Sequence, residues 1–526
     1  MKMNHLPLLS VLLVLLSCSL QEDKALVAVL DDPTVSRKEK LIYVLSDENL
    51  LKMGFNSEQI PVLQAFYKTR NYVPLWVNDS AVTNRGVELR SIIDSSYCFG
   101  VPRNRLVPKK YQLKCIEEEV YLTSNMSLIY SDLKYGFIDF EKKKYKTKSL
   151  TEISRLDSLL SLNKDNLLDS VLLKVHASDT NYQFMSKGLY AFAKSVKIDT
   201  FNYSFKPEKN DTIAFKKTAK AFVRRGFLAG KNVSDFALWR ESVKKLQQWH
   251  GFPQHGHFDK NTCAALNESN YRKIIRLSIE LDKLRQQEKR PKKYVLINIP
   301  SFQLNYFSSD TLRAIHRIIS GKVTNPTPTL RSKINSIVVY PFWNVPYSIA
   351  KNEILPAVKR NANYLKQNNY RIYSNGKEID PHQVNWRSIR GGFPYKVVQD
   401  PGPKNSLGII KFEFHNNFSV YVHDTPSKSL FNSDVRAYSH GCMRCQQPVD
   451  LAKLILSYDS LPYKPNPYTA DSLDTLIQRA KNFPIRLIDP VPIFVEYHTV
   501  TASRKGIIIH LDVYKKEEDF IAFMEK

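Results

Sequence analysis

Apolar residues recur at two different spacings along the chain, which divides it into a helical first part and a strand-rich second part. Between residues 46 and 211 the spacing is mostly helical, as for Ile60, Leu63 and Phe66 in SEQIPVLQAFYKTR. From residue 294 the apolar residues alternate with polar ones, as in YVLINIPSFQLNYF. We therefore expect a multi-domain α+β chain, with a helical scaffold domain over 46–211 and a β-rich domain over 294–526.

A smaller helical unit is expected between these parts, over residues 212–270. This unit resembles the three-helix peptidoglycan-binding-like module of cell-wall enzymes in the helical spacing of its apolar residues, in the glycine that ends its helix and in the predicted N-cap of the next helix. The matching residues are Val243, Leu246, Gln247, Gly251, Gly256, Asp259 and Thr262. These residues determine the fold, so none is assigned a ligand. A connecting helix is expected over 271–293, where Pro291 ends it.

The N-terminus predicts an export signal. Lys2 precedes an apolar run that ends in Leu15-Leu16-Ser17-Cys18 and is too short to span a bilayer. The end of the run resembles a bacterial lipobox, which implies a lipoprotein signal peptide over 1–18 and a lipidated Cys18, followed by a linker over 19–45. Ordinary secretion with cleavage nearby is the alternative. Either way we expect an exported protein, in the periplasm or anchored to a membrane of a Gram-negative bacterium.

The chain is strongly basic, with 77 Lys and Arg against 51 Asp and Glu and a formal charge of +26. Such an excess favours an anionic partner. Export and the lack of zinc-finger or RNA-binding signatures disfavour nucleic acid. An acidic cell-wall polymer therefore fits the charge better, and a membrane contact is expected only through a lipid at Cys18.

The stretch YSHGCMRC at 438–445 places a histidine, a glycine and two cysteines close together. Cys442 and Cys445 have the spacing of zinc ligands, but a structural zinc site needs four ligands and no second pair is present. No metal or other cofactor is therefore expected. A thioredoxin-like redox pair would open a helix in a βαβ unit, whereas these surroundings are β-rich.

A cysteine nucleophile needs a base for its proton and donors for the oxyanion. The strand SVYVHD supplies His423, and alternation places Tyr421 on the same face. Gly441 allows the backbone to approach a substrate closely, so that the amides around Gly441 and Cys442 could bind an oxyanion.

These residues together, HDTPSKSLFNSDVRAYSHGCMR, resemble the signature of the L,D-transpeptidases with a YkuD-type catalytic domain. The order of a scaffold, a peptidoglycan-binding-like module and a catalytic domain with an inserted lid resembles the long periplasmic members similar to YcbB. The insertion over 348–393 would be that lid.

The resemblance implies a role for each motif residue. Cys442 would attack the diaminopimelate–D-Ala bond of a tetrapeptide stem and form a thioester, with His423 as the base. Gly441, His440 and Tyr421 would shape the loop and the oxyanion site. Ser439, Arg444 and Trp343 would contact the substrate. Carbapenems would acylate the cysteine.

Alternatives to a cross-linking transpeptidase remain at this point. The same acyl-enzyme would serve an L,D-carboxypeptidase or an enzyme that attaches a protein to peptidoglycan. A non-enzymatic wall-binding lipoprotein is disfavoured by the intact His423 and Cys442. Cys445 could form a disulfide with Cys442, although a small buried residue at this position is the favoured interpretation.

Overall fold

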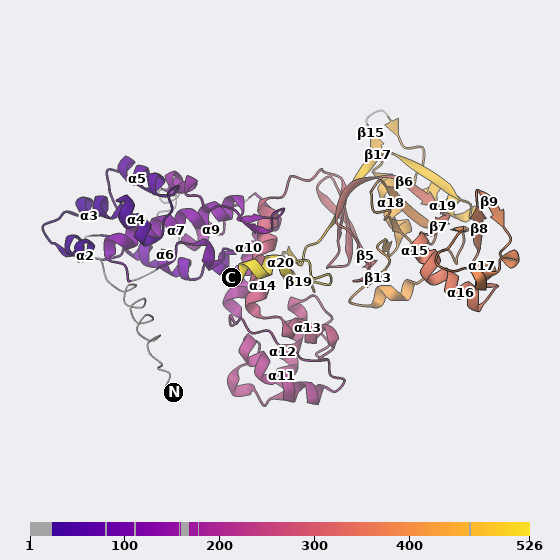
Figure 1. Cartoon of the computed structure of the whole chain (residues 1–526), viewed down its shortest axis with the longest axis horizontal. Coiled ribbons are helices and arrows are strands. Elements are labelled where there is room, and N and C mark those ends of the chain that lie inside the picture. The colour runs from indigo at the N-terminus through magenta and orange to yellow at the C-terminus, as the bar shows by residue number, and fades with distance from the viewer. Residues whose placement is uncertain are drawn as a thin grey trace, which may run out of the picture. The chain divides into compact units, whose positions relative to one another are not determined.

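The computed structural model describes residues 24–525, apart from 79–80, 110–111, 157, 159–167, 177 and 462–463. The predicted signal peptide and Cys18 lie outside the described residues. The chain folds into two compact units (Figure 1). The first holds the chain up to residue 287 together with 500–509 and the chain from 517, and the second holds 288–499 and 510–516.

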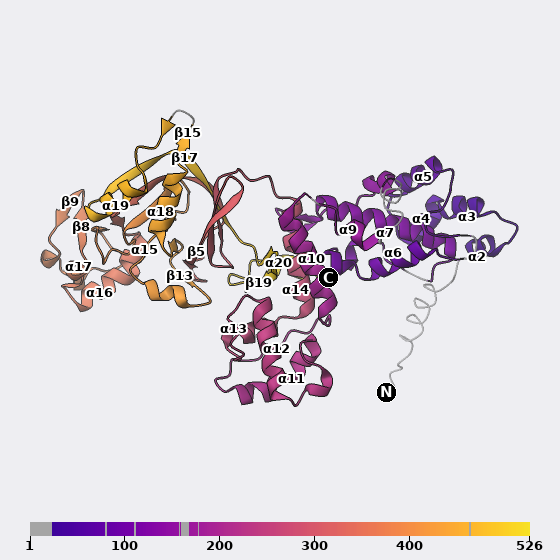
Figure 2. The ribbon, with the colours of Figure 1, turned by 180° about the vertical axis from the view of Figure 1, so that it is seen from behind.

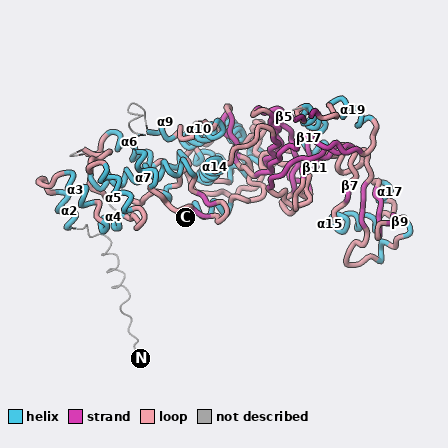
Figure 3. Tube along the Cα trace, turned by 90° about the horizontal axis from the view of Figure 1, so that it is seen from above, coloured by secondary structure: helices cyan, strands magenta, loops and turns pink. Residues whose placement is uncertain are grey.

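The first unit is helical (cyan in Figure 3). Its helices before the small module are α2 (Lys24–Asp31), α3 (Arg37–Val44), α4 (Asp47–Met53), α5 (Ile60–Thr69), α6 (Asn84–Asp94), α7 (Cys115–Tyr135), α9 (Leu168–Leu172) and α10 (Thr180–Ser195). Helices α2 and α3 lie where we expected a linker. A capping box between Ser36 and Glu39 starts α3, and Leu41 and Val44 are buried, so this segment packs into the scaffold.

The small module has its own apolar core, formed by helices α11 (Asp211–Arg225), α12 (Phe236–Trp249) and α13 (Lys260–Asn267). Each helix begins at a side chain that accepts a hydrogen bond from the first turn, with Asp259 capping α13 as its sequence position predicts.

Helix α14 (Asn270–Arg285) differs from the expected connector. It ends at Arg285, before Pro291, and is buried on nearly all sides. The hairpin of β18 (Val500–Ser503) and β19 (Gly506–Ile509) and the helix α20 (Glu518–Met524) pack in this first unit. We expected the β-rich unit to extend over 294–526. It is smaller, because apolar residues of 500–509 and 518–524 belong to the cores of the helical unit.

The second unit is built on a nine-stranded sheet in the order β13-β5-β14-β12-β11-β6-β17-β3-β4, which closes on itself because β4 also pairs with β5. Its strands are β3 (Tyr294–Asn298), β4 (Gln303–Ser308), β5 (Thr311–Gly321), β6 (Leu330–Val339), β11 (Ile410–Phe414), β12 (Val422–His423), β13 (Ala437–Ser439), β14 (Met443–Cys445) and β17 (Phe483–Glu496). Helices α18 (Pro448–Ser457) and α19 (Ala470–Gln478) pack on its apolar core. The chain is thus multi-domain α+β, as predicted.

The segment between β6 and β11 forms a small cap with a four-stranded sheet in the order β7-β10-β8-β9. The strands are β7 (Trp343–Asn344), β8 (Tyr370–Ser374), β9 (Lys377–Ile379) and β10 (Lys396–Gln399), with helices α15 (Tyr347–Ile349), α16 (Leu355–Arg360) and α17 (Tyr364–Gln367). The sequence of the insertion 348–393 is mostly polar and shows no continuous core-like period. The cap instead buries its own apolar cluster, including Ile354, Trp386 and Phe393, because residues distant in the segment meet there.

One partly buried carboxylate joins the start of the second unit to the end of its longest strand. Glu496 is held by Arg290 at 2.6 Å and by His498 at 2.7 Å. Burial alone would raise its pKa, but these two partners outweigh burial and lower the pKa of Glu496 to about 2. In the part of the chain that is described, no helix is both long and apolar enough to cross a membrane.

Candidate active site

The predicted catalytic residues lie on two neighbouring parallel strands, β12 and β14. The two strands pair so that His423 lies beside Arg444, and Cys442 directly precedes β14. Side chains alternate along a strand, so Tyr421 and His423 share one face, where their rings lie 5.6 Å apart. The closed sheet therefore brings the histidine strand and the cysteine loop together.

Ser439 holds the cysteine loop in shape. Its hydroxyl donates to the Cys442 carbonyl (2.5 Å) and accepts from the Gly441 N–H (3.1 Å). Gly441 has a φ of 117°, which favours glycine. We expected Ser439 to contact the substrate, but its hydroxyl is used inside the loop and the residue is only 3% exposed. The Gly441 N–H already donates to Ser439, so the candidate oxyanion donors are the Cys442 N–H and the Tyr421 hydroxyl.

Two residues that no motif marked support this loop from behind. The Thr327 hydroxyl donates to the Gly441 carbonyl and accepts from the Gly321 N–H, both at 2.8 Å. Tyr514 donates to the Gly321 carbonyl (2.5 Å) and accepts from the Thr327 N–H (3.3 Å). A Cβ at position 321 would lie 2.1 Å from the Asn325 carbonyl oxygen, so the turn requires glycine. Only the fold reveals this chain of contacts, because its members are far apart in sequence.

The Cys442 thiol is held in its protonated form. Burial raises its pKa, and the hydrogen bonds from Tyr421 and the positive charges of Lys411 and Arg444 only partly oppose this effect. Burial and the neighbouring thiol raise the pKa of Tyr421 far above its usual value, so its hydroxyl stays a hydrogen-bond donor. Lys411 lies with its Nζ 4.5 Å from the centre of the Tyr421 ring and pairs with Glu413.

His423 is neutral at physiological pH. It is 5% exposed, and burial together with the charges of Arg444 and Lys411 lowers its pKa to about 3. Its Nδ1 is buried and has no hydrogen-bond partner among the described residues. A buried ring nitrogen without a hydrogen-bond partner is uncommon in folded proteins. A neutral imidazole can accept a proton.

Arg444 and Trp343 border the same site. Arg444 is half-buried and has no ion-pair or hydrogen-bond partner within the described chain. Its guanidinium keeps its positive charge and is therefore free to bind an anion. Trp343, on β7, is 8% exposed and lies close enough to Tyr421 to lower the pKa of its hydroxyl slightly against the effect of burial. The tryptophan thus connects the cap to the strand that carries the candidate base.

His440 makes a second contact between the motif and the cap. Its Nε2 lies 2.6 Å from Glu353 Oε1, in the π-helical turn Ala350–Ile354, and both side chains are partly exposed. We expected His440 to shape the loop, and the structure adds an acidic partner from the inserted segment. Nothing in the pattern around Glu353 indicated this pairing, which depends on how the cap lies against the sheet of the same unit.

Cys445 lies in the core and not in the cleft. Along β14, Met443 and Cys445 are completely buried whereas Arg444 between them is not. Cys442 and Cys445 are both free thiols. Burial raises the pKa of Cys445 far above its usual value. The second cysteine of the C-x-x-C stretch therefore packs as an apolar residue in the structure.

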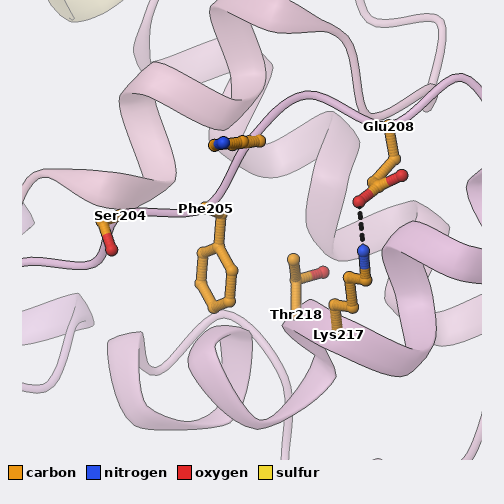
Figure 4. A pocket seen from close by; sticks show the side chains of 6 residues that line it. Ser204, Phe205, Glu208, Lys217 and Thr218 are labelled. Carbon is orange, nitrogen blue, oxygen red and sulfur yellow. Dashed lines mark hydrogen bonds and ion pairs between the residues drawn. The ribbon is translucent and has the colours of Figure 1, made fainter.

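Other hollows were compared with this site. A groove of about 400 Å³ is lined by residues of β6, of β11 and of the loop between β11 and β12, and it reaches Tyr421. A hollow of about 330 Å³ lies on the small module beside α11, where Lys217 and Glu208 form an ion pair (Figure 4). Its lining includes neither a cysteine nor a histidine. Among the described residues no group of three or more His, Cys, Asp or Glu is placed to hold a metal ion.

Residues 292–493 match the family model of the L,D-transpeptidase catalytic domain, known as YkuD. Residues 61–189 match a model described as a scaffold domain. The resemblance of the motif to the YkuD-type L,D-transpeptidase catalytic domain is therefore confirmed for residues 292–493.

A Haemophilus influenzae protein, whose name assigns it provisionally to the L,D-transpeptidases, is 33% identical over 221 residues. The match covers 42% of this chain and 44% of the relative, so the chain spans less than half of that relative's length.

Solved structures were also found. An L,D-transpeptidase of Mycobacterium smegmatis is 12% identical, covers 39% of this chain and 58% of its own, and has a TM-score of 0.18. An Enterococcus faecium L,D-transpeptidase is 11% identical, covers 50% and 89%, and has a TM-score of 0.17. Scores this low carry no argument about this protein.

Proposed function

We propose that this protein is an L,D-transpeptidase that forms peptidoglycan cross-links through a thioester on Cys442. The observation that carries the proposal is the pairing of β12 with β14, which presents a buried neutral imidazole and a protonated thiol from adjacent strands. Proton transfer from thiol to imidazole creates a nucleophile only when a substrate arrives, since burial disfavours both charged forms in the resting protein.

In the proposed reaction, Cys442 Sγ attacks the carbonyl at the L-centre of diaminopimelate in a tetrapeptide stem. The thiol proton passes to His423 and then to the amine of the departing D-Ala, and a thioester remains. An amine of a second stem attacks this thioester, His423 takes its proton, and the thiol is restored. The Cys442 N–H and the Tyr421 hydroxyl would stabilise the oxyanion in both steps.

Arg444 gives the proposed site its preference for an acidic substrate. The guanidinium has no partner within the described residues, and a stem peptide carries free carboxylates. The overall excess of basic residues adds a longer-range attraction for the same polymer.

The cap favours an amine acceptor over water. It has its own core and meets the motif at His440 through Glu353 and at Tyr421 through Trp343. A covered thioester is shielded from hydrolysis, which would otherwise give an L,D-carboxypeptidase. Transfer to a protein amine uses the same acyl-enzyme and would appear as a different product.

The test is incubation of the purified protein with a disaccharide-tetrapeptide, followed by mass spectrometry of products and of the intact protein. We expect cross-linked dimer, released D-Ala and a covalent acyl adduct. Cys442→Ala should abolish all three, while Cys445→Ala should retain them, because Cys442 is partly exposed and Cys445 is completely buried. A carbapenem should add once to the parent and not to Cys442→Ala. Turnover by Cys442→Ala would contradict the proposal.

We propose that the protein acts in the cell envelope. We infer export to the periplasm, either soluble or anchored by a lipid at Cys18, from the N-terminal pattern. Metabolic labelling with a palmitate analogue would test the anchor, since Cys18→Ala should remove the label. An unlabelled parent would support ordinary secretion.

A further inference from the structure

Helix α12 and strand β19 both belong to the first unit (Figure 2). A groove of about 650 Å³ lies where the end of α12 meets the hairpin β18–β19. This volume is within the range typical of ligand pockets, about 300–1,000 Å³. It contains no residue of the cysteine site, which belongs to the other unit. Neither the catalytic domain nor the scaffold domain recognised in this chain includes it, since it is formed by residues 195–254 and 503–508.

The walls of the groove are fixed by close packing. A Cβ on Gly188 would lie 2.1 Å from the Ile507 side chain, and one on Gly251 would lie 2.8 Å from that of Ile508. Trp249, at the end of α12, packs edge-on against Phe192, with ring centres 5.1 Å apart. The hairpin therefore lies directly on the helices, and the groove is preformed rather than created by a ligand.

The charge of the groove has one sign. Lys245 and Lys505 line it, and no acidic side chain does. Neither lysine has an ion-pair partner among the residues that the structure describes, although many other basic residues of the chain do. Gln248 and Gln254 line the same groove with side-chain amides that make no hydrogen bond within the described chain. These groups can bind carboxylates and amides.

Apart from Ser195 and Ser503, the remaining lining is apolar or aromatic and includes Trp249, Phe252 and Ile508. An aromatic floor with amide and ammonium groups at its rim fits a ligand that has flat apolar faces, amide groups and negative charge. An N-acetylated sugar that bears a carboxylate or an acidic peptide has these features. A membrane surface would instead be met by a protruding basic or amphipathic element, not by a concave groove.

We propose that this groove binds an N-acetylated, acidic sugar–peptide unit of peptidoglycan at a distance from the chemical step. The identity of the polymer rests on the proposed function, whereas the preference for an anionic amphipathic ligand rests on the groove alone. Lys245 and Lys505 bind the carboxylates, and the aromatic floor contacts the sugar. The hairpin thereby gives the small module a binding surface that its three helices do not form by themselves.

The test uses the full chain carrying Cys442→Ala, so that binding is measured without turnover. Binding to insoluble peptidoglycan is measured by co-sedimentation, and binding to soluble disaccharide-tetrapeptide by calorimetry. We expect Lys245→Ala/Lys505→Ala to weaken both about tenfold or more, since each substitution removes a hydrogen bond to a charged group. The matched control is Lys216→Ala/Lys220→Ala, which removes the same charge from an exposed face of α11 and should change binding less than twofold.

Further arms separate this proposal from the proposed function. In the protein that retains Cys442, the groove variant should release D-Ala from a sugar-free tetrapeptide at the same rate as the parent. If the parent itself releases no D-Ala, that result would count against the proposed function alone. Equal binding by the groove variant and the parent would overturn the groove proposal, as would equal losses in the groove and control variants. Binding to phosphatidylglycerol vesicles, without binding to peptidoglycan, would also overturn it in favour of a lipid site.

Discussion

Replacing Thr327 with valine is expected to destabilise the second unit and to slow acylation of Cys442. Valine has nearly the shape of threonine but lacks the hydroxyl, and Thr327 is completely buried. The change removes the hydrogen bonds to the Gly441 carbonyl and from the Gly321 N–H. Both peptide groups would then lie in a protein interior without the partner that the hydroxyl supplies.

The size of the effect follows from these two lost contacts. Each hydrogen bond contributes about 0.5–1.5 kcal/mol net, and a buried peptide group left unpaired costs about 1–3 kcal/mol, so we expect a loss of about 2–4 kcal/mol. In a unit of this size the loss would lower Tm by roughly 5–15 °C. Acylation should fall by at least about tenfold, because displacement of Gly441 misplaces the attacking thiol.

Calorimetry of the full chain measures the first effect, since the unfolding transition of the second unit should move while that of the helical unit stays. Intact-mass kinetics with a carbapenem measure the second. Thr327→Ser keeps the hydroxyl and should restore acylation, and Thr324→Val, at an exposed threonine of the same turn, should match the parent. If Thr327→Val matches Thr327→Ser in both assays, the hydroxyl does not hold the loop and the reasoning is wrong.

Three further predictions concern other contacts. The depressed pKa of Glu496 contributes stability that is present above about pH 4.5 and is lost as the pH falls toward 2. Glu496→Gln should therefore make the urea midpoint decline less steeply over this pH range. A decline as steep as that of the parent would contradict this prediction. Glu353→Gln weakens the contact with His440 and should raise the ratio of hydrolysed to cross-linked product several-fold, without a measurable change in Tm. An unchanged ratio would show that this contact does not limit the access of water to the thioester. Cys445→Ala should respond to oxidants as the parent does, and a loss of reversible oxidation in this variant would instead reveal a disulfide.

The prediction of the cap shows where local patterns mislead. Its sequence looked polar because its apolar residues are spread among loops and very short strands. They form a core only when β8 and β10 pair and bring Ile372 and Val397 side by side. The expected linker failed for a similar reason, since the burial of Leu41 depends on helices much later in the chain. Periodicity over a short window cannot report such contacts.

The sequence by itself determined the class of the catalytic domain and the residues that identify it. A histidine on a strand and a cysteine after a glycine are local chemical features, and alternation already placed Tyr421 beside His423. The tertiary structure decided which groups support them. Thr327, Tyr514 and Glu353 reach the cysteine loop only because the closed sheet and the cap fold segments that are distant in sequence onto one place. Burial, which holds both His423 and Cys442 uncharged, is likewise a property of the packed fold and not of the motif.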